Sequence, residues 1–162
     1  MSAGKLTTIV AIDVDGFAAL AEADEAGAIA GVARLGERCA KIAEIYGGRI
    51  FNTSGDAVMM EFSSVSGGVH AAADLAADPD PPIRVAVHVG EVSPMPTGDL
   101  LGRGVSVVAQ LQKHARPGVV LISGFALPFL AAAALATAAL LAATLWLPES
   151  RPAPVEHHPT AV

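Results

Sequence analysis

Residues 6–16 read LTTIVAIDVDG, and this stretch decides the fold. A β-branched apolar run over Leu6–Val14 that ends in an Asp-Gly cluster predicts a buried strand. After Gly16 the apolar residues recur every third or fourth position while charged residues take the other faces, which predicts one long amphipathic helix. Its apolar face comprises Ile29, Val32, Leu35, Cys39, Ile42 and Ile45.

Two glycines at 47 and 48 end that helix, and further elements follow. Short strands over 49–53 and 57–62 are expected to form a hairpin. Beyond them we expect a helix over 63–77, a strand over 83–92, a helix over 103–115 and a strand over 119–123. This order of elements predicts an α/β (α+β) sandwich of the ferredoxin-like type, with helices covering one face of the sheet.

The C-terminal region has a different character. Residues 125–147 read FALPFLAAAALATAALLAATLWL, an uncharged run long enough to cross a bilayer core of about 30 Å. We predict a transmembrane helix here, because a small domain can hardly bury all faces of so long a helix in its core, the weaker alternative. Lys113 and Arg116 precede the run and only Arg151 follows it, which favours a cytoplasmic membrane protein whose N-terminal domain faces the cytoplasm. The tail over 148–162 is predicted to be disordered.

Composition narrows the functional classes. The net charge is −6 and no basic cluster is present, so nucleic acid is not an expected partner. Cys39 is the only cysteine, which excludes a disulfide within one chain and fits a reducing cytoplasm. The N-terminal apolar segment is too short for a signal peptide. A cytoplasmic domain of residues 5–124 joined to a membrane segment is therefore expected.

Two aspartates are candidate metal ligands. Asp13 ends the first strand and Asp56 follows Gly55 in the hairpin, and hairpin strands in a ferredoxin-like sheet can lie beside the first strand. Adjacent carboxylates repel each other unless a cation lies between them. The backbone N–H groups of Gly16 and Phe17 can face a phosphate, although plain turn chemistry also explains an Asp-Gly pair.

Four stretches in order resemble the motif set of class III adenylyl and guanylyl cyclase catalytic domains, including a bacterial branch with FNT-type motifs. They are TTIVAIDVDGFAALAEADE (7–25), GGRIFNTSGDAVMMEF (47–62), IRVAVHVGEV (83–92) and GDLLGRGVSVVAQLQKHARPGVVLISG (98–124). Coincidence is a poor explanation for four ordered motifs. The resemblance implies a nucleotidyl cyclase sandwich over residues 5–124.

By this resemblance, Asp13 and Asp56 hold two Mg²⁺ (or Mn²⁺) ions, with the backbone carbonyl of Val14 as a further ligand. Such ions would activate the ribose 3′-hydroxyl and neutralise the departing pyrophosphate. Arg84 matches the family's arginine that contacts the β and γ phosphates from the same subunit; a solvated charge at a strand end is its alternative reading.

In the family that the chain resembles, the residues that read the purine are donated by the dimer partner. Asn52 stands where the family usually has an adenine-reading Lys, and Asp99 retains the acidic position. A carboxylate accepts from the adenine 6-amino group but repels the guanine 6-oxo group, so ATP is favoured over GTP.

The sequence departs from the family pattern in GVSVVAQLQ (104–112), where the family typically has an Asn and an Arg aimed at the transition state. Ser106 and Gln110 occupy these positions, and loss of one such donor typically costs about 10²- to 10³-fold in rate. The family also usually continues beyond residue 124 with another helix and closing strands. A homodimer is thus expected to be nearly inactive, whereas a heterodimer with a complete cyclase would have one good site.

Two functions from different classes remain. The first is a membrane-tethered adenylate cyclase subunit that converts ATP to cyclic AMP and pyrophosphate with a second cyclase domain. The alternative is a catalytically silent, nucleotide-binding or regulatory module. A truncated gene would also explain the missing C-terminal elements.

Overall fold

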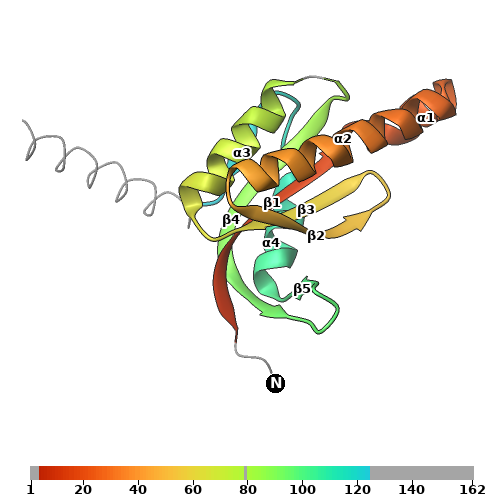
Figure 1. The fold of residues 1–162 in the computed structure, drawn as a ribbon. Helices are drawn as coiled ribbons and strands as arrows, with labels where there is room; N and C mark the ends of the chain where they lie inside the picture. Colours follow the sequence, from red (N-terminus) through yellow and green to blue (C-terminus); the bar gives the residue numbers. More distant parts are fainter. Residues whose placement is uncertain (1–3, 79, 125–162) are drawn as a thin grey trace, which may run out of the picture.

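A computed structural model describes residues 4–78 and 80–124, and in it strands alternate with helices along the chain (Figure 1). The first strand leads through a short turn into two consecutive helices, as Figure 1 shows. The elements in chain order are β1 (Lys5–Val14), α1 (Phe17–Ala23), α2 (Glu25–Ile45), β2 (Gly48–Ser54), β3 (Ala57–Phe62), α3 (Val65–Ala77), β4 (Ile83–Pro94), β5 (Leu100–Leu101), α4 (Arg103–Gln112) and β6 (Val120–Ile122).

The strands form one sheet with the order β2-β3-β1-β4-β5, and β6 pairs with β4 in parallel. The four long strands pair antiparallel in the order β2-β3-β1-β4, which is the ferredoxin-like arrangement. The predicted mixed α/β sandwich is therefore confirmed. β1 lies between β3 and β4, which explains why its sequence is almost continuously apolar.

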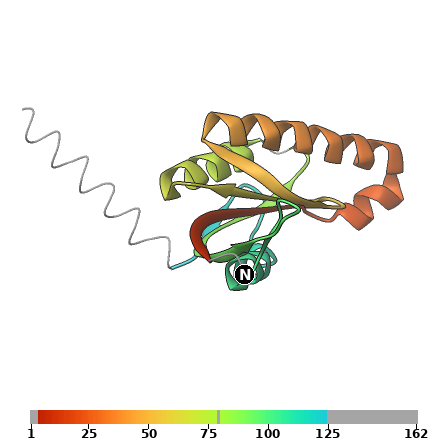
Figure 2. The same cartoon turned by 60° about the horizontal axis from the view of Figure 1, so that its bottom comes forward.

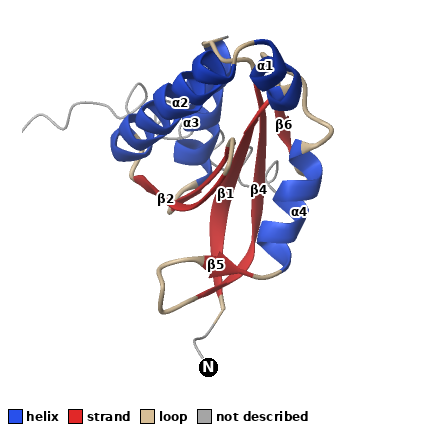
Figure 3. Cartoon of the chain, turned by 90° about the vertical axis from the view of Figure 1, so that its right-hand side faces the viewer, coloured by secondary structure: helices blue, strands red, loops and turns tan. Residues whose placement is uncertain are grey.

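Helices cover both faces of this sheet, so the prediction that they cover one face is wrong (Figures 2 and 3). Successive side chains of β1 point to opposite faces. Val10 and Ile12 join the core under α2 and α3, whereas Ile9 and Ala11 join a second core that includes Val108 of α4. Because β1 is apolar on both faces, both need a covering layer.

The predicted long helix after Gly16 is two helices. Asp24 separates them, and its Oδ1 caps α2 by accepting a hydrogen bond from the Gly27 N–H at 3.0 Å. The apolar face of α2 is also narrower than predicted, because Ile29 is 59% exposed and Ile45 is 70% exposed. Both lie near an end of α2. Cys39, in the middle, is fully buried, and this burial raises the pKa of its thiol to about 12.

The other elements differ from prediction mainly at their ends. α4 ends at Gln112 rather than at 115, and β4 continues to Pro94, where it pairs with the unpredicted two-residue strand β5. No helix within residues 4–78 and 80–124 is long and apolar enough to cross a membrane. The transmembrane helix predicted over 125–147 and the tail predicted over 148–162 lie outside the described residues.

Candidate active site

The structure brings the two candidate metal ligands together at one end of the sheet. β1 pairs with β3 so that Asp13 lies opposite Ala57, which places Asp56 one residue further along. Gly55 adopts a φ of 60°, a left-handed conformation that lets the hairpin turn tightly before Asp56. Two carboxyl groups that are far apart in the sequence therefore converge on the α4 side of the sheet.

The two carboxyl groups lie close enough for the charge of Asp13 to raise the pKa of Asp56. Burial raises the pKa of the Asp56 carboxyl most strongly, while its own backbone N–H acts in the opposite direction. The negative charge of Asp13 and a hydrogen bond between the two carboxyls raise it further, and Arg84 partly offsets this. Two carboxyls in contact share either a proton or a cation.

Arg84 completes this acidic cluster. It lies opposite Asp13 in the register of β1 and β4 and forms an ion pair with the Asp13 carboxylate. Its Nε lies 3.4 Å from Asp15 Oδ1, an ion pair by distance in which Nε lacks a well-aligned hydrogen bond. The carboxylates of Asp13, Asp15 and Asp56 outnumber this one guanidinium, so the cluster favours a cation.

Oxygen donors of this kind suit Mg²⁺ and Mn²⁺. Within residues 4–78 and 80–124, no group of three or more His, Cys, Asp or Glu side chains is arranged to hold a metal ion. The acidic pair therefore fits a metal that takes its remaining ligands from backbone, water or substrate. The side chain of Val14 is buried in the core, so only its backbone is available as a ligand.

The turn after Asp13 places two further predicted residues. Gly16 is exposed with a φ of 68°, which favours glycine, and it begins α1 without a side-chain cap. Phe17 is half-buried and packs against the α2 and α3 core. The turn is fixed from the other side, because the Asp15 N–H donates to the Pro82 carbonyl at 2.8 Å.

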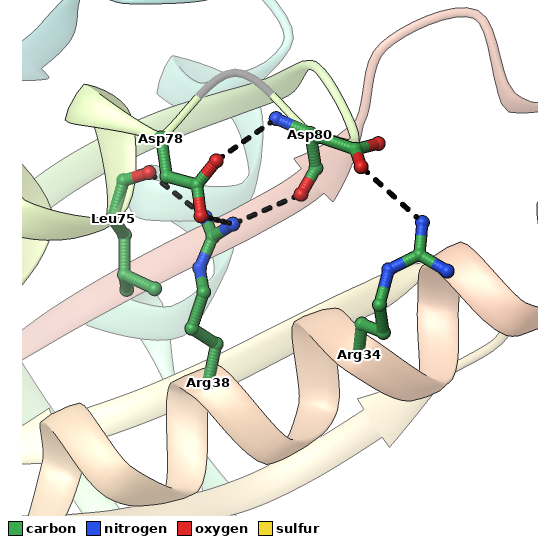
Figure 4. A network of polar contacts seen from close by, with 5 residues as sticks. All are labelled: Arg34, Arg38, Leu75, Asp78 and Asp80. Carbon is green, nitrogen blue, oxygen red and sulfur yellow. Dashed lines mark hydrogen bonds and ion pairs between the residues drawn. The ribbon is translucent and has the colours of Figure 1, made fainter.

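Two arginines of α2 hold the segment that precedes β4 (Figure 4). Arg38 Nη1 donates to the Asp80 carbonyl at 3.0 Å and lies 2.7 Å from the Asp78 carboxylate, while its Nη2 donates to the Leu75 carbonyl at 3.0 Å. Arg34 adds an exposed contact with Asp80 at 3.4 Å. These contacts fix the entry of β4 beside the acidic turn.

The two predicted purine-reading residues also come together. A shallow pocket of about 330 Å³ is lined by Ile50, Phe51, Asn52, Thr53 and Asp99. A bulge in β2 shifts the register so that Asn52 pairs with Met59. Met59 packs in the core under α4, so Asn52 lies on the same side of the sheet as the acidic cluster.

Ser106 and Gln110 lie elsewhere. Both are exposed on α4, one turn apart, and line an open hollow of about 420 Å³ with Val107, Leu111 and His114. The Ser106 hydroxyl donates to the Gly102 carbonyl at 3.4 Å. None of the five residues lining this hollow belongs to the acidic cluster, so Ser106 and Gln110 do not share a hollow with the predicted metal ligands.

Sequence reasoning assigned no role to Arg49 and Glu61, which form an ion pair at 2.5 Å; Arg49 directly precedes Ile50, a residue of the Asn52–Asp99 pocket. Arg49 Nη1 also donates to the Gly98 carbonyl at 2.8 Å. The signal in the sequence was a charged residue inside the apolar strand AVMMEF, where Glu61 is only 8% exposed.

Comparison with known proteins identifies the fold. No family model matches the chain. A curated relative, "Putative adenylate cyclase 3" of Rhizobium meliloti (strain 1021), is 36% identical over 131 residues, which cover 74% of this chain and 22% of the relative. This chain thus spans about a fifth of the length of that relative.

Solved structures of cyclase domains are also similar to this chain. The guanylate cyclase domain of RhGC from Catenaria anguillulae, in complex with GTP, matches with a TM-score of 0.72 and 18% identity over 79% of this chain and 84% of that one. An adenylate cyclase from Trypanosoma brucei in its monomeric state matches with a TM-score of 0.67 and 19% identity over 75% and 74% of the two chains. The described residues therefore have the fold of class III nucleotidyl cyclase catalytic domains.

Proposed function

We propose that this chain is an adenylate cyclase-like subunit that converts ATP to cyclic AMP and pyrophosphate in a dimer with a second cyclase domain. The observation that carries the proposal is the placement of Asp13 at the end of β1 opposite Ala57, which brings its carboxyl beside that of Asp56 in the turn between β2 and β3. In the cyclase fold such a pair needs a cation to be stable in its fully ionised form. The similarity to an adenylate cyclase sequence supports the same assignment.

In the reaction, the ribose 3′-oxygen attacks the α-phosphorus, the bond from that phosphorus to the bridging oxygen breaks, and the 3′-hydroxyl proton leaves. Two Mg²⁺ or Mn²⁺ ions would acidify the hydroxyl and stabilise the leaving pyrophosphate. Asp13, Asp56 and the Val14 carbonyl would hold them. The backbone N–H groups of Gly16 and Phe17 lie at the start of α1, next to these ligands, where they can donate to phosphate oxygens.

Arg84 has two possible partners in this scheme. Without nucleotide it pairs with Asp13 and Asp15. A bound triphosphate offers more negative charge and pairs of oxygens that can accept two parallel N–H bonds, so Arg84 would exchange the aspartates for the β and γ phosphates. This exchange would also release the Asp13 carboxylate for metal binding.

Asn52 and Asp99, which share one pocket, would choose the nucleotide that is held by the partner's metal ligands. The Asp99 carboxylate can accept from the adenine 6-amino group, and the Asn52 amide can donate to a ring nitrogen. A guanine would present an acceptor to Asp99 and would be disfavoured. ATP is therefore the proposed substrate.

The exposed Ser106 and Gln110 make the proposed subunit dependent on its partner. These side chains line a hollow that contains none of the acidic residues, which supports a site completed by a second chain that faces the cluster. We propose a heterodimer in which this chain supplies the metal ligands and a complete cyclase supplies the transition-state donors. The 125–147 run would tether the subunit to the cytoplasmic membrane.

A catalytically silent regulatory module is the second candidate. Two observations favour it: the replacement of both transition-state donors, and the pairing of Arg84 with the same aspartates that would bind metal. Such a module would bind nucleotide or a cyclase partner without turnover.

A cyclic AMP assay with Mg²⁺ and Mn²⁺ separates the candidates. The chain alone should be nearly inactive, and activity should appear in the double variant Ser106→Asn/Gln110→Arg. It should also appear when the wild-type chain is mixed with a class III cyclase that lacks its metal-binding aspartates. If every combination stays inactive while the folded chain binds ATP, the silent module is the correct assignment.

A further inference from the structure

Glu61 is a buried carboxylate held between two cations. It lies opposite Arg49 in the register of β2 and β3, and Arg49 Nε donates to its Oε1 at 2.5 Å. Lys5 Nζ, from β1, lies 2.8 Å from its Oε2, an ion pair by distance without well-aligned hydrogen-bond geometry. Since the glutamate is only 8% exposed, removing one cation would leave a poorly solvated charge.

The balance of forces keeps this glutamate ionised. Burial is the largest influence and raises the pKa of Glu61, but the close contacts and positive charges of Lys5 and Arg49 together outweigh it and lower the pKa below its ordinary value. An ionised Glu61 anchors one edge of the planar Arg49 guanidinium at neutral pH.

The other edge of Arg49 binds the loop between β4 and β5. Its Nη1 donates to the Gly98 carbonyl at 2.8 Å. The loop is a compact turn in which the Met95 N–H donates to the Asp99 carbonyl at 2.8 Å and the Thr97 hydroxyl donates to Asp99 Oδ2 at 3.0 Å. These hydrogen bonds join the loop residues to one another, and Arg49 joins the loop to the sheet.

Arg49 therefore connects both walls of the purine pocket. It precedes Asn52 by three residues on β2, and it holds the residue next to Asp99. Asn52 and Asp99 line the same pocket. A guanidinium can make both contacts through its fixed fork, whereas a lysine ammonium is a point charge on a flexible stem.

We propose that Arg49, oriented by Glu61, is a positioning residue that sets Asp99 against Asn52 and thereby determines the preference for adenine over guanine. The inference rests on the proposed function, because it requires that this pocket read a purine. A polar site discriminates between bases only while its donors and acceptors keep their relative positions. Loosening the loop would therefore weaken discrimination more than overall binding.

The test measures dissociation constants of fluorescent ATP and GTP analogues for the full-length chain in detergent micelles with Mn²⁺. Wild type should bind the ATP analogue more tightly, and Arg49→Ala should reduce this preference about tenfold. Arg49→Lys should keep more of the preference for the ATP analogue than Arg49→Ala does, but less than wild type. Arg34→Ala is the matched control: the Arg34 side chain is 55% exposed against 45% for Arg49, and its removal also breaks one carboxylate contact, but Arg34 does not line the Asn52–Asp99 pocket.

Hydrogen exchange of the 95–99 amides supplies an independent readout. Exchange should accelerate in Arg49→Ala and stay unchanged in Arg34→Ala. If Arg49→Ala does not fold, Glu61→Gln keeps the side-chain shape, releases the same guanidinium and should show the same two effects. An unchanged nucleotide preference or unchanged loop exchange overturns the inference alone. Failure of wild type to bind either nucleotide overturns the proposed function, and the inference falls with it.

Discussion

The acidic cluster and the outer surface of α4 belong to the same fold but differ in how well they match the resemblance to class III cyclases. At the cluster, Asp13 of β1, Asp56 of the turn between β2 and β3, and Arg84 of β4 converge, and they are the residue types that the resemblance predicts for metal and phosphate binding. On α4, Ser106 and Gln110 stand in place of the Asn and Arg that the resemblance predicts, although the helix itself is intact. A helix can thus hold the matching positions without the matching side chains, so turnover must be tested at each surface separately.

The largest expected effect comes from restoring the α4 surface. Ser106→Asn and Gln110→Arg each add a donor aimed at the partner's acidic cluster, and each is expected to raise the cyclization rate by about 10²- to 10³-fold. Cyclic AMP production by the homodimer is the measurement. Both substitutions are on an exposed helix face, so thermal unfolding should change little. Equal activity before and after the substitutions would show that α4 is not the deficient surface.

The opposite change should remove what the chain still contributes. Asp13→Asn in the wild-type chain should lower Mn²⁺ affinity at least about tenfold, because one of two charged oxygen ligands is lost. Titration calorimetry with Mn²⁺ measures this directly and does not depend on turnover. Asp74→Asn, an exposed carboxylate on α3, is the control, and equal losses in both variants would show that the binding is nonspecific.

A third prediction tests how closely α4 packs against the sheet. A Cβ added at Gly104 would lie 3.0 Å from the Glu91 carbonyl oxygen, and backbone cannot easily yield. Gly104→Ala should therefore destabilise the fold by about 1–3 kcal/mol. Gly36→Ala on α2, where nothing lies within 4 Å, should instead stabilise it by about 0.5–1 kcal/mol. Denaturant unfolding of both variants checks the opposite signs.

Sequence reasoning was strongest where the pattern was local. The apolar run of β1 and the Asp-Gly turn predicted the strand, and the order of elements predicted the sheet. It was weaker at the boundaries between helices. The capping of α2 by Asp24 split a helix that periodicity had joined, because one aspartate side chain outweighed a continuous pattern.

The same contrast holds within the candidate site. Motif positions led to Asp13 and Asp56, but nothing local in the sequence shows that Arg49 reaches the Gly98 carbonyl, since that contact joins residues 49 positions apart. The side on which α4 packs was also missed. It depends on both faces of β1 being apolar and on the close approach of Gly104 to β4, which a periodicity reading of α4 alone does not contain.

The smallest expected effect is on the folding stability of the chain, which the ionised Asp13–Asp56 pair lowers. The pKa of Asp56 is raised in the folded chain above its ordinary value of 3.8, so the folded state binds this proton more tightly than the unfolded state. Stability from this group is then complete below about pH 3.8 and is lost as the pH rises through the folded pKa. Asp56→Asn, which cannot ionise, should therefore have a higher Tm than wild type at pH 7.

That difference in Tm should shrink as the pH is lowered towards 3.8, the ordinary value for Asp56. Adding Mn²⁺ at pH 7 should raise the Tm of wild type and leave Asp56→Asn nearly unchanged, because only the ionised pair gains a ligand that binds the folded state. A variant that is less stable than wild type at pH 7 without metal would show that the two carboxyls do not repel. The acidic cluster would then contribute to folding stability, and charge repulsion between its carboxyls would not favour metal binding.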